Sequence, residues 1–207
     1  MKDISRDGDR VIDWGKTSGD YSKWRPNYPE RFFDLLRLFD VGVRGQRILD
    51  LGTGVGFLAI RFAQSGADVT AIDISQEQIA EATRCAAAFG VGVDFRVGRA
   101  EETGMPTRSF DVVTASQWWL YFDKSLAIPE VLRLLKPGGF LVTTHFAWLP
   151  RIDHIAHASE QLVLKHNPQW SAAGLSGERP FNPAWIDAHF RVKAMFVFNE
   201  AIPFTRE

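Results

Sequence analysis

The sequence has little cysteine, little net charge and no long apolar run, and each shortage excludes a class of protein. Cys85 is the single cysteine among 207 residues, so the chain cannot form an internal disulfide. The net charge of −1 gives no overall basic surface for nucleic acid or an anionic membrane. No run of about 18 uninterrupted apolar residues occurs, so we expect no membrane span.

The beginning of the chain is charged and lacks the apolar core of a secretory signal, so we expect a cytoplasmic protein. Hydrophobic residues make up 45% of the chain and charged residues 24%, which is typical of a globular protein. The length suits a single domain, residues 1–207, with a sizeable core. His154 and His157 lie one helical turn apart, but no third ligand is spaced to complete a metal site, so we expect none.

What the chain does have is a glycine-rich turn directly after an apolar strand. Gly52, Gly54 and Gly56 stand at alternate positions, and glycine lets a ligand approach the backbone closely. A dinucleotide-binding loop has the spacing G-x-G-x-x-G, whereas here Phe57 occupies the sixth position. The spacing G-x-G-x-G is typical of S-adenosylmethionine (SAM) binders, and Asp50 before it would face a cationic group. The alternative is that these glycines only allow a tight turn to pack.

A second acidic residue, Asp73, ends the next β-rich run about 20 residues beyond the first glycine. An acidic side chain at this place can accept hydrogen bonds from ribose hydroxyls. The alternative role is a helix N-cap. Ser75 suits that role better, because Ser75 and Gln78 have the spacing of a capping box.

Strand and helix patterns alternate along most of the chain. We expect strands at residues 47–51, 68–72, 93–97, 110–114 and 140–144, and helices from residue 29 and at residues 55–65, 76–89 and 126–135. This alternation predicts an α/β fold, a doubly wound and mostly parallel sheet with helices on both faces. Pro137 and Gly138 predict a turn before the fifth strand.

Residues 148–180 interrupt the alternation after the fifth strand. They contain a predicted helix at residues 152–165 and then a loop rich in Gly, Ser, Pro and Asn. An insertion at this edge of the sheet is expected to be a helical cover over the substrate, the alternative being a packing excursion. Residues 192–198 alternate in polarity and predict a further strand.

Four blocks, residues 48–56, 69–75, 98–106 and 135–139, follow one another in a familiar order. Through them the chain resembles the class I SAM-dependent methyltransferases of the small-molecule type, related to the ubiquinone and menaquinone biosynthesis C-methyltransferases. The resemblance implies their Rossmann-like fold and an N-terminal flap over the cofactor at residues 1–28. In that family a further segment with an antiparallel strand follows. Nothing in this chain clearly supplies it, so the chain is truncated or the far edge of the sheet is rebuilt.

The resemblance implies SAM as cofactor and S-adenosylhomocysteine as product. It also implies that Asp50 and Gly52 hold the methionine part, Asp73 the ribose and Ile74 the adenine ring. Tyr21 would lie over the sulfonium and Arg25 would pair with the methionine carboxylate. The complete expected cofactor set is Tyr21, Arg25, Asp50, Gly52, Thr53, Gly54, Gly56, Asp73, Ile74, Ala100, Glu101 and Gln117.

The segment after the fourth strand is the best indication of the methyl acceptor. A subgroup of the resembled family has histidine where Leu120 stands, so that base is missing here. Its aromatic residues suggest a flat apolar wall, the alternative being that some of them are core residues. The expected acceptor contacts are Trp118, Trp119, Tyr121, His145 and Trp148, and the candidate catalytic residues are His145 and Gln117.

We therefore expect a SAM-dependent methyltransferase that acts on a small, apolar or aromatic acceptor. The sulfonium donor arrives activated, so positioning and exclusion of water carry most of the chemistry, and a base is needed only if the acceptor must lose a proton. Two alternatives are a non-catalytic SAM-binding sensor or partner module and a nucleotide-binding oxidoreductase. The sequence leaves open the acceptor atom (O, N or C) and whether the protein is a monomer or a homodimer.

Overall fold

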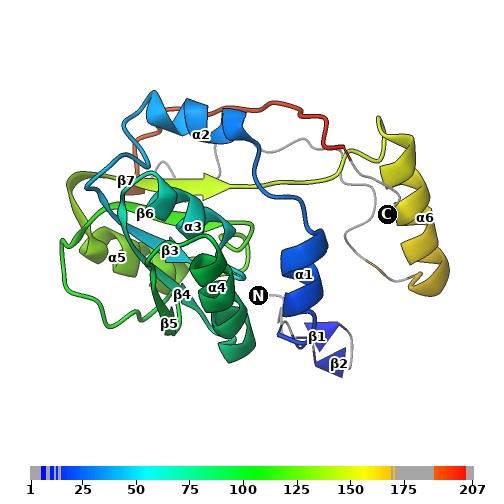
Figure 1. Ribbon diagram of the computed structural model, residues 1–207, viewed down its shortest axis with the longest axis horizontal. Coiled ribbons are helices and arrows are strands. Elements are labelled where there is room, and N and C mark those ends of the chain that lie inside the picture. Colours follow the sequence, from blue (N-terminus) through cyan, green and yellow to red (C-terminus); the bar gives the residue numbers. More distant parts are fainter. Residues whose placement is uncertain are drawn as a thin grey trace. The chain divides into compact units, whose positions relative to one another are not determined.

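The computed structural model describes residues 6–7, 10–11, 13, 15–168, 170 and 189–203 (Figure 1). The chain divides into two units. The first comprises Met1–Thr144 and Phe196–Glu207, and the second comprises His145–Met195.

The first unit is built on a five-stranded parallel sheet with the strand order β5-β4-β3-β6-β7. The central strand lacks polar alternation because it is covered on both faces, and Ile48, Leu49 and Leu51 are fully buried. The strands are β3 Arg47–Leu51, β4 Asp68–Asp73, β5 Asp94–Val97, β6 Phe110–Ser116 and β7 Leu135–Thr144. The predicted doubly wound parallel sheet is confirmed.

The helices of the first unit lie on both faces of this sheet. They are α2 Glu30–Arg37, α3 Phe57–Gln64, α4 Gln76–Ala88 and α5 Lys124–Leu134. The connections through α3 and α4 run from β3 toward β5, whereas α5 leads from β6 to β7 in the opposite direction (Figure 1). Right-handed crossovers in opposite directions place their helices on opposite faces. In open parallel sheets, ligands usually bind at the carboxyl ends of the strands where the order reverses, which here are β3 and β6.

Two elements differ in detail from the expectation. Helix α5 begins before residue 126, because the Asp123 side chain caps it by accepting a hydrogen bond from Ser125 N at 3.0 Å. Pro129 consequently lies inside the helix and not in its first turn. Strand β7 includes Pro137 and Gly138, where a turn before the strand was expected. Its pairing with β6 shifts in register there, from Leu135 to Phe140, and Gly138 has φ +81°.

The strand predicted at residues 192–198 is wrong. No strand occurs within residues 189–203, which are described throughout. In the first unit the ring of Phe196 packs on Phe39 just beyond α2, at a centroid distance of 5.6 Å, and Arg31 of α2 lies 5.1 Å from the ring of Phe198. The apolar side chains at the end of this segment are thus partly covered by a helix, so the alternating pattern needs no neighbouring strand.

The described residues of the N-terminal segment form regular secondary structure. A short hairpin pairs β1 Arg6–Asp7 with β2 Arg10–Val11, and helix α1 spans Ser18–Trp24. The hydroxyl of Ser22 hydrogen bonds to Glu81, which places α1 against α4.

The second unit contains helix α6, His154–His166, close to the helix predicted at residues 152–165. Asp153 caps it by accepting a hydrogen bond from Ala156 N at 2.8 Å. Residues 171–180 of the predicted cover lie outside the described residues. No helix in the described part of the chain is long and apolar enough to cross a membrane.

Candidate functional site

In the glycine loop between β3 and α3, Gly56 is closely packed whereas Gly54 borders open space. Gly54 and Gly56 both have positive φ, +57° and +84°. A methyl group on Gly56 would lie 3.1 Å from both Ala82 and the ring of Phe95. A methyl group on Gly54 would meet only Gln78 Oε1, at 3.9 Å. Gly56 therefore allows helix packing, whereas Gly54 presents open backbone to a ligand.

Asp73 at the end of β4 holds this loop in place. Its Oδ2 accepts a hydrogen bond from Gly54 N at 2.9 Å, and its Oδ1 accepts one from Ser75 N at 3.0 Å. Each carboxylate oxygen has a further lone pair, so ribose hydroxyls can still be bound. Ser75 is the N-cap of α4 as predicted and accepts a hydrogen bond from Gln78 N at 3.2 Å. Ile74, between them, is 58% exposed, which suits a platform for an adenine ring.

Asp50 lies beneath the loop and not on its surface. Its side chain is buried, and its Oδ1 accepts a hydrogen bond from Thr114 Oγ1 at 2.6 Å. Burial raises the pKa of Asp50 to about 6, and the negative charge of Asp73 acts in the same direction. Because the carboxylate has little access to solvent, its charge would act on a ligand across the loop.

The segment after β6 begins with a strained turn. Gln117 has φ +62°, which is rare for a residue other than glycine. Trp118 N donates to Ser116 O at 2.6 Å, so Gln117 is the central residue of a γ-turn. The turn directs Trp118 to the glycine loop, where a methyl group on Gly52 would lie 2.8 Å from Trp118 Cβ. The ring of Tyr121 lies 5.3 Å from that of Trp118.

The third aromatic residue of the expected wall, Trp119, lies in the core. It is 3% exposed, its ring contacts Phe122 edge-on at 6.0 Å, and Lys124 Nζ lies 5.3 Å from its centroid. Tyr121, by contrast, is 44% exposed. The alternative of a core residue thus applies to Trp119, and the aromatic surface beside the glycine loop is formed by Trp118 and Tyr121.

Tyr28, at the end of the expected N-terminal flap, makes a hydroxyl contact that the sequence did not indicate. The phenol of Tyr28 hydrogen bonds to Ser116 Oγ, which in turn hydrogen bonds to Thr144 Oγ1. Burial raises the pKa of Tyr28 to about 12, so the phenol stays neutral. The only sequence signal was the presence of hydroxyl residues at the ends of two neighbouring strands.

Tyr21 and Arg25 lie close to the start of α3. The ring of Tyr21 stacks on Phe57, the first residue of α3, at 6.1 Å, and Arg25 Cζ lies 5.8 Å from the ring of Tyr21. Tyr21 therefore lies beside the glycine loop, as expected for a cover. The ring of Tyr28 packs on that of Phe32 at a centroid distance of 5.2 Å, and its hydroxyl is hydrogen bonded to Ser116.

The loop after β5 connects the expected adenine end to the acceptor segment. Ala100 is buried, and Glu101 Oε1 accepts a hydrogen bond from Asp123 N at 3.3 Å. Glu101 Oε2 also lies 3.7 Å from Arg99 Nη2. Glu101 thus connects the loop after β5 to Asp123, the N-cap of α5.

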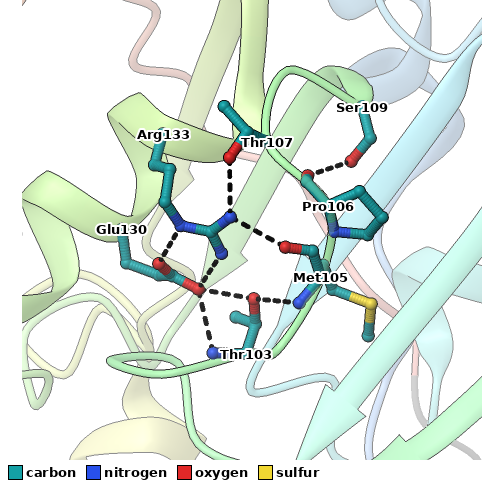
Figure 2. A network of polar contacts seen from close by, with 7 residues as sticks. All are labelled: Thr103, Met105, Pro106, Thr107, Ser109, Glu130 and Arg133. Atoms are coloured by element: carbon teal, nitrogen blue, oxygen red, sulfur yellow. Dashed lines mark hydrogen bonds and ion pairs between the residues drawn. The ribbon is translucent and has the colours of Figure 1, made fainter.

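A polar network anchors the same loop to α5 (Figure 2). Glu130 accepts hydrogen bonds from Thr103 N at 2.9 Å and from Thr103 Oγ1 at 2.6 Å. Arg133 binds both oxygens of Glu130 at 2.7 Å and donates to Met105 O at 2.8 Å. Figure 2 shows these groups converging from the loop and from α5. Glu130 and Arg133 have the local i,i+3 spacing of a helical ion pair, but no local pattern indicates their hydrogen bonds to Thr103 and Met105, which are distant along the chain.

His145 and Trp148 stand at the start of the second unit, directly after β7. Their roles as base and as acceptor contact stay predictions. Across the described residues, no group of three or more His, Cys, Asp or Glu side chains could hold a metal ion.

Known proteins that are similar to this chain are methyltransferases. A model described as "Methyltransferase domain" matches residues 49–143, from the glycine loop to β7. An uncharacterized methyltransferase of Mycobacterium tuberculosis is 37% identical over 133 residues, which cover 64% of this chain and 51% of that protein. Residues 49–143 thus resemble a methyltransferase domain, and the matches support a SAM-dependent methyltransferase of class I.

A further relative is similar in sequence, and a solved structure is similar in fold. A ubiquinone biosynthesis O-methyltransferase of Xanthomonas oryzae pv. oryzae is 38% identical over 150 residues, covering 70% of this chain and 63% of that protein. The structure of a putative SAM-dependent methyltransferase from Methanococcus maripaludis has a TM-score of 0.62, covers 80% of this chain and 78% of its own, and is 18% identical, so this match concerns the fold. The chain spans about half the length of the first curated relatives that it matches.

Proposed function

We propose that this protein transfers a methyl group from SAM to a small, apolar or aromatic acceptor, chiefly by positioning the acceptor and excluding water. The observation that carries the proposal is the contact of Trp118 with Gly52, because an aromatic side chain then lies directly beside the glycine loop. A methyl donor held at that loop and a planar acceptor on that surface would be neighbours. In-line displacement at an activated methyl group needs little more than this proximity.

The cofactor would lie across the carboxyl ends of β3 and β4. Asp73 would accept the ribose hydroxyls, Ile74 would pack on adenine, and the open backbone of Gly54 would face the ligand. The charge of Asp50 would favour the methionine ammonium group and the sulfonium through the loop. The other predicted members of the set are Tyr21, Arg25, Gly52, Thr53, Gly56, Ala100, Glu101 and Gln117.

The acceptor would stack on Trp118 or on Tyr121, whose rings are inclined to each other by 59°, since aromatic surfaces favour planar ligands. The Xanthomonas relative is named for O-methylation in ubiquinone biosynthesis, which makes hydroxylated apolar rings the first acceptors to test. An oxygen acceptor must lose its proton, and His145 is the residue that we propose for this step. Trp148 would be a further acceptor contact, and residues 148–180 the cover.

Titration calorimetry with SAM, S-adenosylhomocysteine and NAD tests the cofactor. We expect the first two to bind at micromolar affinity, roughly −8 kcal/mol, and NAD to show no heat. Incubation with SAM and a panel of phenols, catechols and quinols, followed by measurement of S-adenosylhomocysteine, tests turnover. Binding of NAD without SAM would support an oxidoreductase, and SAM binding without turnover of any acceptor class would support the sensor alternative.

Two neighbouring tryptophans form a matched pair for the acceptor surface. Trp118→Ala should leave the fold intact and weaken acceptor binding by about 1–3 kcal/mol, through loss of a stacking surface. Trp119→Ala should instead lower the free energy of unfolding by about 3–5 kcal/mol, because it opens a cavity in the core. Urea unfolding and acceptor KM measure the two effects. If His145→Ala abolishes turnover while Trp118→Ala behaves as wild type, a base and not positioning dominates the reaction.

A further inference from the structure

We propose that Gln117 is a positioning residue whose strained turn holds Trp118 against Gly52, so that occupancy of the cofactor loop orders the acceptor segment, residues 117–123. This inference rests on the proposed function, because it assigns the order in which the two parts of the site are assembled. SAM would bind first, and the surface for the acceptor would take its final form around it.

The strain at Gln117 is maintained by contacts on both sides of the turn. Gln117 N donates to Thr144 O at 2.9 Å, which ties the turn to the end of β7. Ser116, the residue before it, is held through its hydroxyl by both Tyr28 and Thr144. An unfavourable backbone conformation persists only where surrounding contacts determine it, and such sites are concentrated at functional positions.

The turn at Gln117 sets the position of Trp118, the next residue in the chain. Trp118 lies so close to Gly52 that a single methyl group would not fit between them. A change in the glycine loop on binding SAM is therefore transmitted to Trp118 by direct contact, and then to Tyr121, whose N–H donates to Trp118 O at 2.8 Å. The packed contact leaves the indole little freedom to absorb such a change.

The far end of the acceptor segment has a second connection to the cofactor site. Asp123 N donates to Glu101 Oε1, and Glu101 is a predicted neighbour of the adenine ring. The segment is thus connected at one end to the expected methionine subsite, through Trp118, and at the other to the expected adenine subsite. A ligand that fills both subsites would fix residues 117–123 at both ends.

Hydrogen exchange at residues 118–123, with and without S-adenosylhomocysteine, tests the coupling in wild type, Gln117→Ala and Gln117→Gly. Both variants remove the side chain, but only glycine relieves the strain at φ +62°. In wild type and Gln117→Ala, each saturated with S-adenosylhomocysteine, we expect the ligand to slow exchange by at least about fivefold, the lower end of typical coupling. In Gln117→Gly the effect should be largely lost. Gln117→Gly should also melt at a higher temperature than Gln117→Ala, since its turn is unstrained.

The possible results distinguish failure of the coupling, of the role of the Gln117 turn and of the proposed function. If S-adenosylhomocysteine binds and slows exchange in the glycine loop but not at residues 118–123 in wild type, the coupling is wrong and the cofactor assignment stands. If all three proteins respond equally, the turn at Gln117 does not position Trp118. If the ligand does not bind to wild type, the proposed function fails and the coupling fails with it.

Discussion

Gly54 and Gly56 have similar backbone conformations but different surroundings. Substitutions at these two residues can therefore distinguish an effect on ligand binding from an effect on packing. Alanine is strained at both positions because both have positive φ. At Gly56 the added methyl group would in addition press on Ala82 and Phe95, neither of which is the end of a flexible chain.

Gly56→Ala should therefore be the less stable variant, by about 1–3 kcal/mol, the usual cost of overpacking. Gly54→Ala should unfold at a higher urea concentration but lose more affinity for S-adenosylhomocysteine, because its methyl group points into the expected ligand space. Urea unfolding and calorimetry on both variants measure this. Unchanged ligand affinity in Gly54→Ala would remove that residue from the cofactor site.

Asp50 should make both cofactor binding and stability depend on pH. Its pKa is raised to about 6 from 3.8, so the carboxylate is charged above pH 6 and neutral well below it. SAM affinity should fall as the pH drops from 7 to 5, because the neutral form no longer attracts a cation. Calorimetry across this range measures the effect, and Asp50→Asn, which cannot titrate, should bind SAM more weakly and with little pH dependence.

The effect of Asp50 on folding has the opposite direction. A carboxyl group whose pKa is higher in the folded than in the unfolded protein destabilises the fold once it ionises, by about 3 kcal/mol for a shift of this size. Its contribution therefore improves as the pH falls from 6 to 4. Asp50→Asn should unfold at a higher temperature than wild type at pH 8, and this gain should vanish near pH 4. An equal gain at both pH values would show that charge is not the cause.

At the scale of elements, the loop after β5 depends on its anchor to α5. Glu130→Gln should lower the free energy of unfolding by about 1.5–3 kcal/mol, because it weakens several charged hydrogen bonds. The exposed pair of Asp94 and Arg96 serves as the control, and Asp94→Asn should cost less than about 1 kcal/mol.

The pH dependence of the same variant depends on the hydrogen bonds of Arg133. They lower the pKa of Glu130 to about 2, below its ordinary value of 4.5. The stabilisation by Glu130 is therefore present above pH 4.5 and is lost only as the pH falls toward 2. The difference in stability between wild type and Glu130→Gln should be constant between pH 8 and pH 5. A difference that disappears already at pH 5 would contradict the assignment.

At the scale of the whole molecule, the cofactor should stabilise the first unit selectively. S-adenosylhomocysteine at a hundred times its dissociation constant should add about 2.7 kcal/mol, equivalent to about 5–10 °C in melting temperature for a chain of this size. Hydrogen exchange should place the added protection at the glycine loop, β4 and the start of α4. Protection confined to residues 145–195 would move the binding site to the second unit.

The parallel sheet, the helices on both faces and the place of the glycine loop were predictable from the sequence. Each depends on a local pattern. Apolar runs mark the buried strands, glycine spacing marks the turn after β3, and Ser75 marks the start of α4. Such patterns can be recognised in the sequence because all the residues that form them belong to one helix, strand or turn.

The tertiary structure decided which side chains of an irregular segment meet. Trp118 and Trp119 are adjacent and chemically identical, yet one contacts Gly52 and the other is in the core, because a turn without periodicity sets their directions. The hydroxyl contacts of Tyr28, Ser116 and Thr144 join residues far apart along the chain, so no sequence pattern indicates them.

The alternation of apolar and polar residues at 192–198 was misleading for a related reason. Such alternation indicates a strand only where another strand pairs with it. Sequence alone thus determined the framework and the glycine loop, whereas long-range contacts decided how the segment after β6 is arranged.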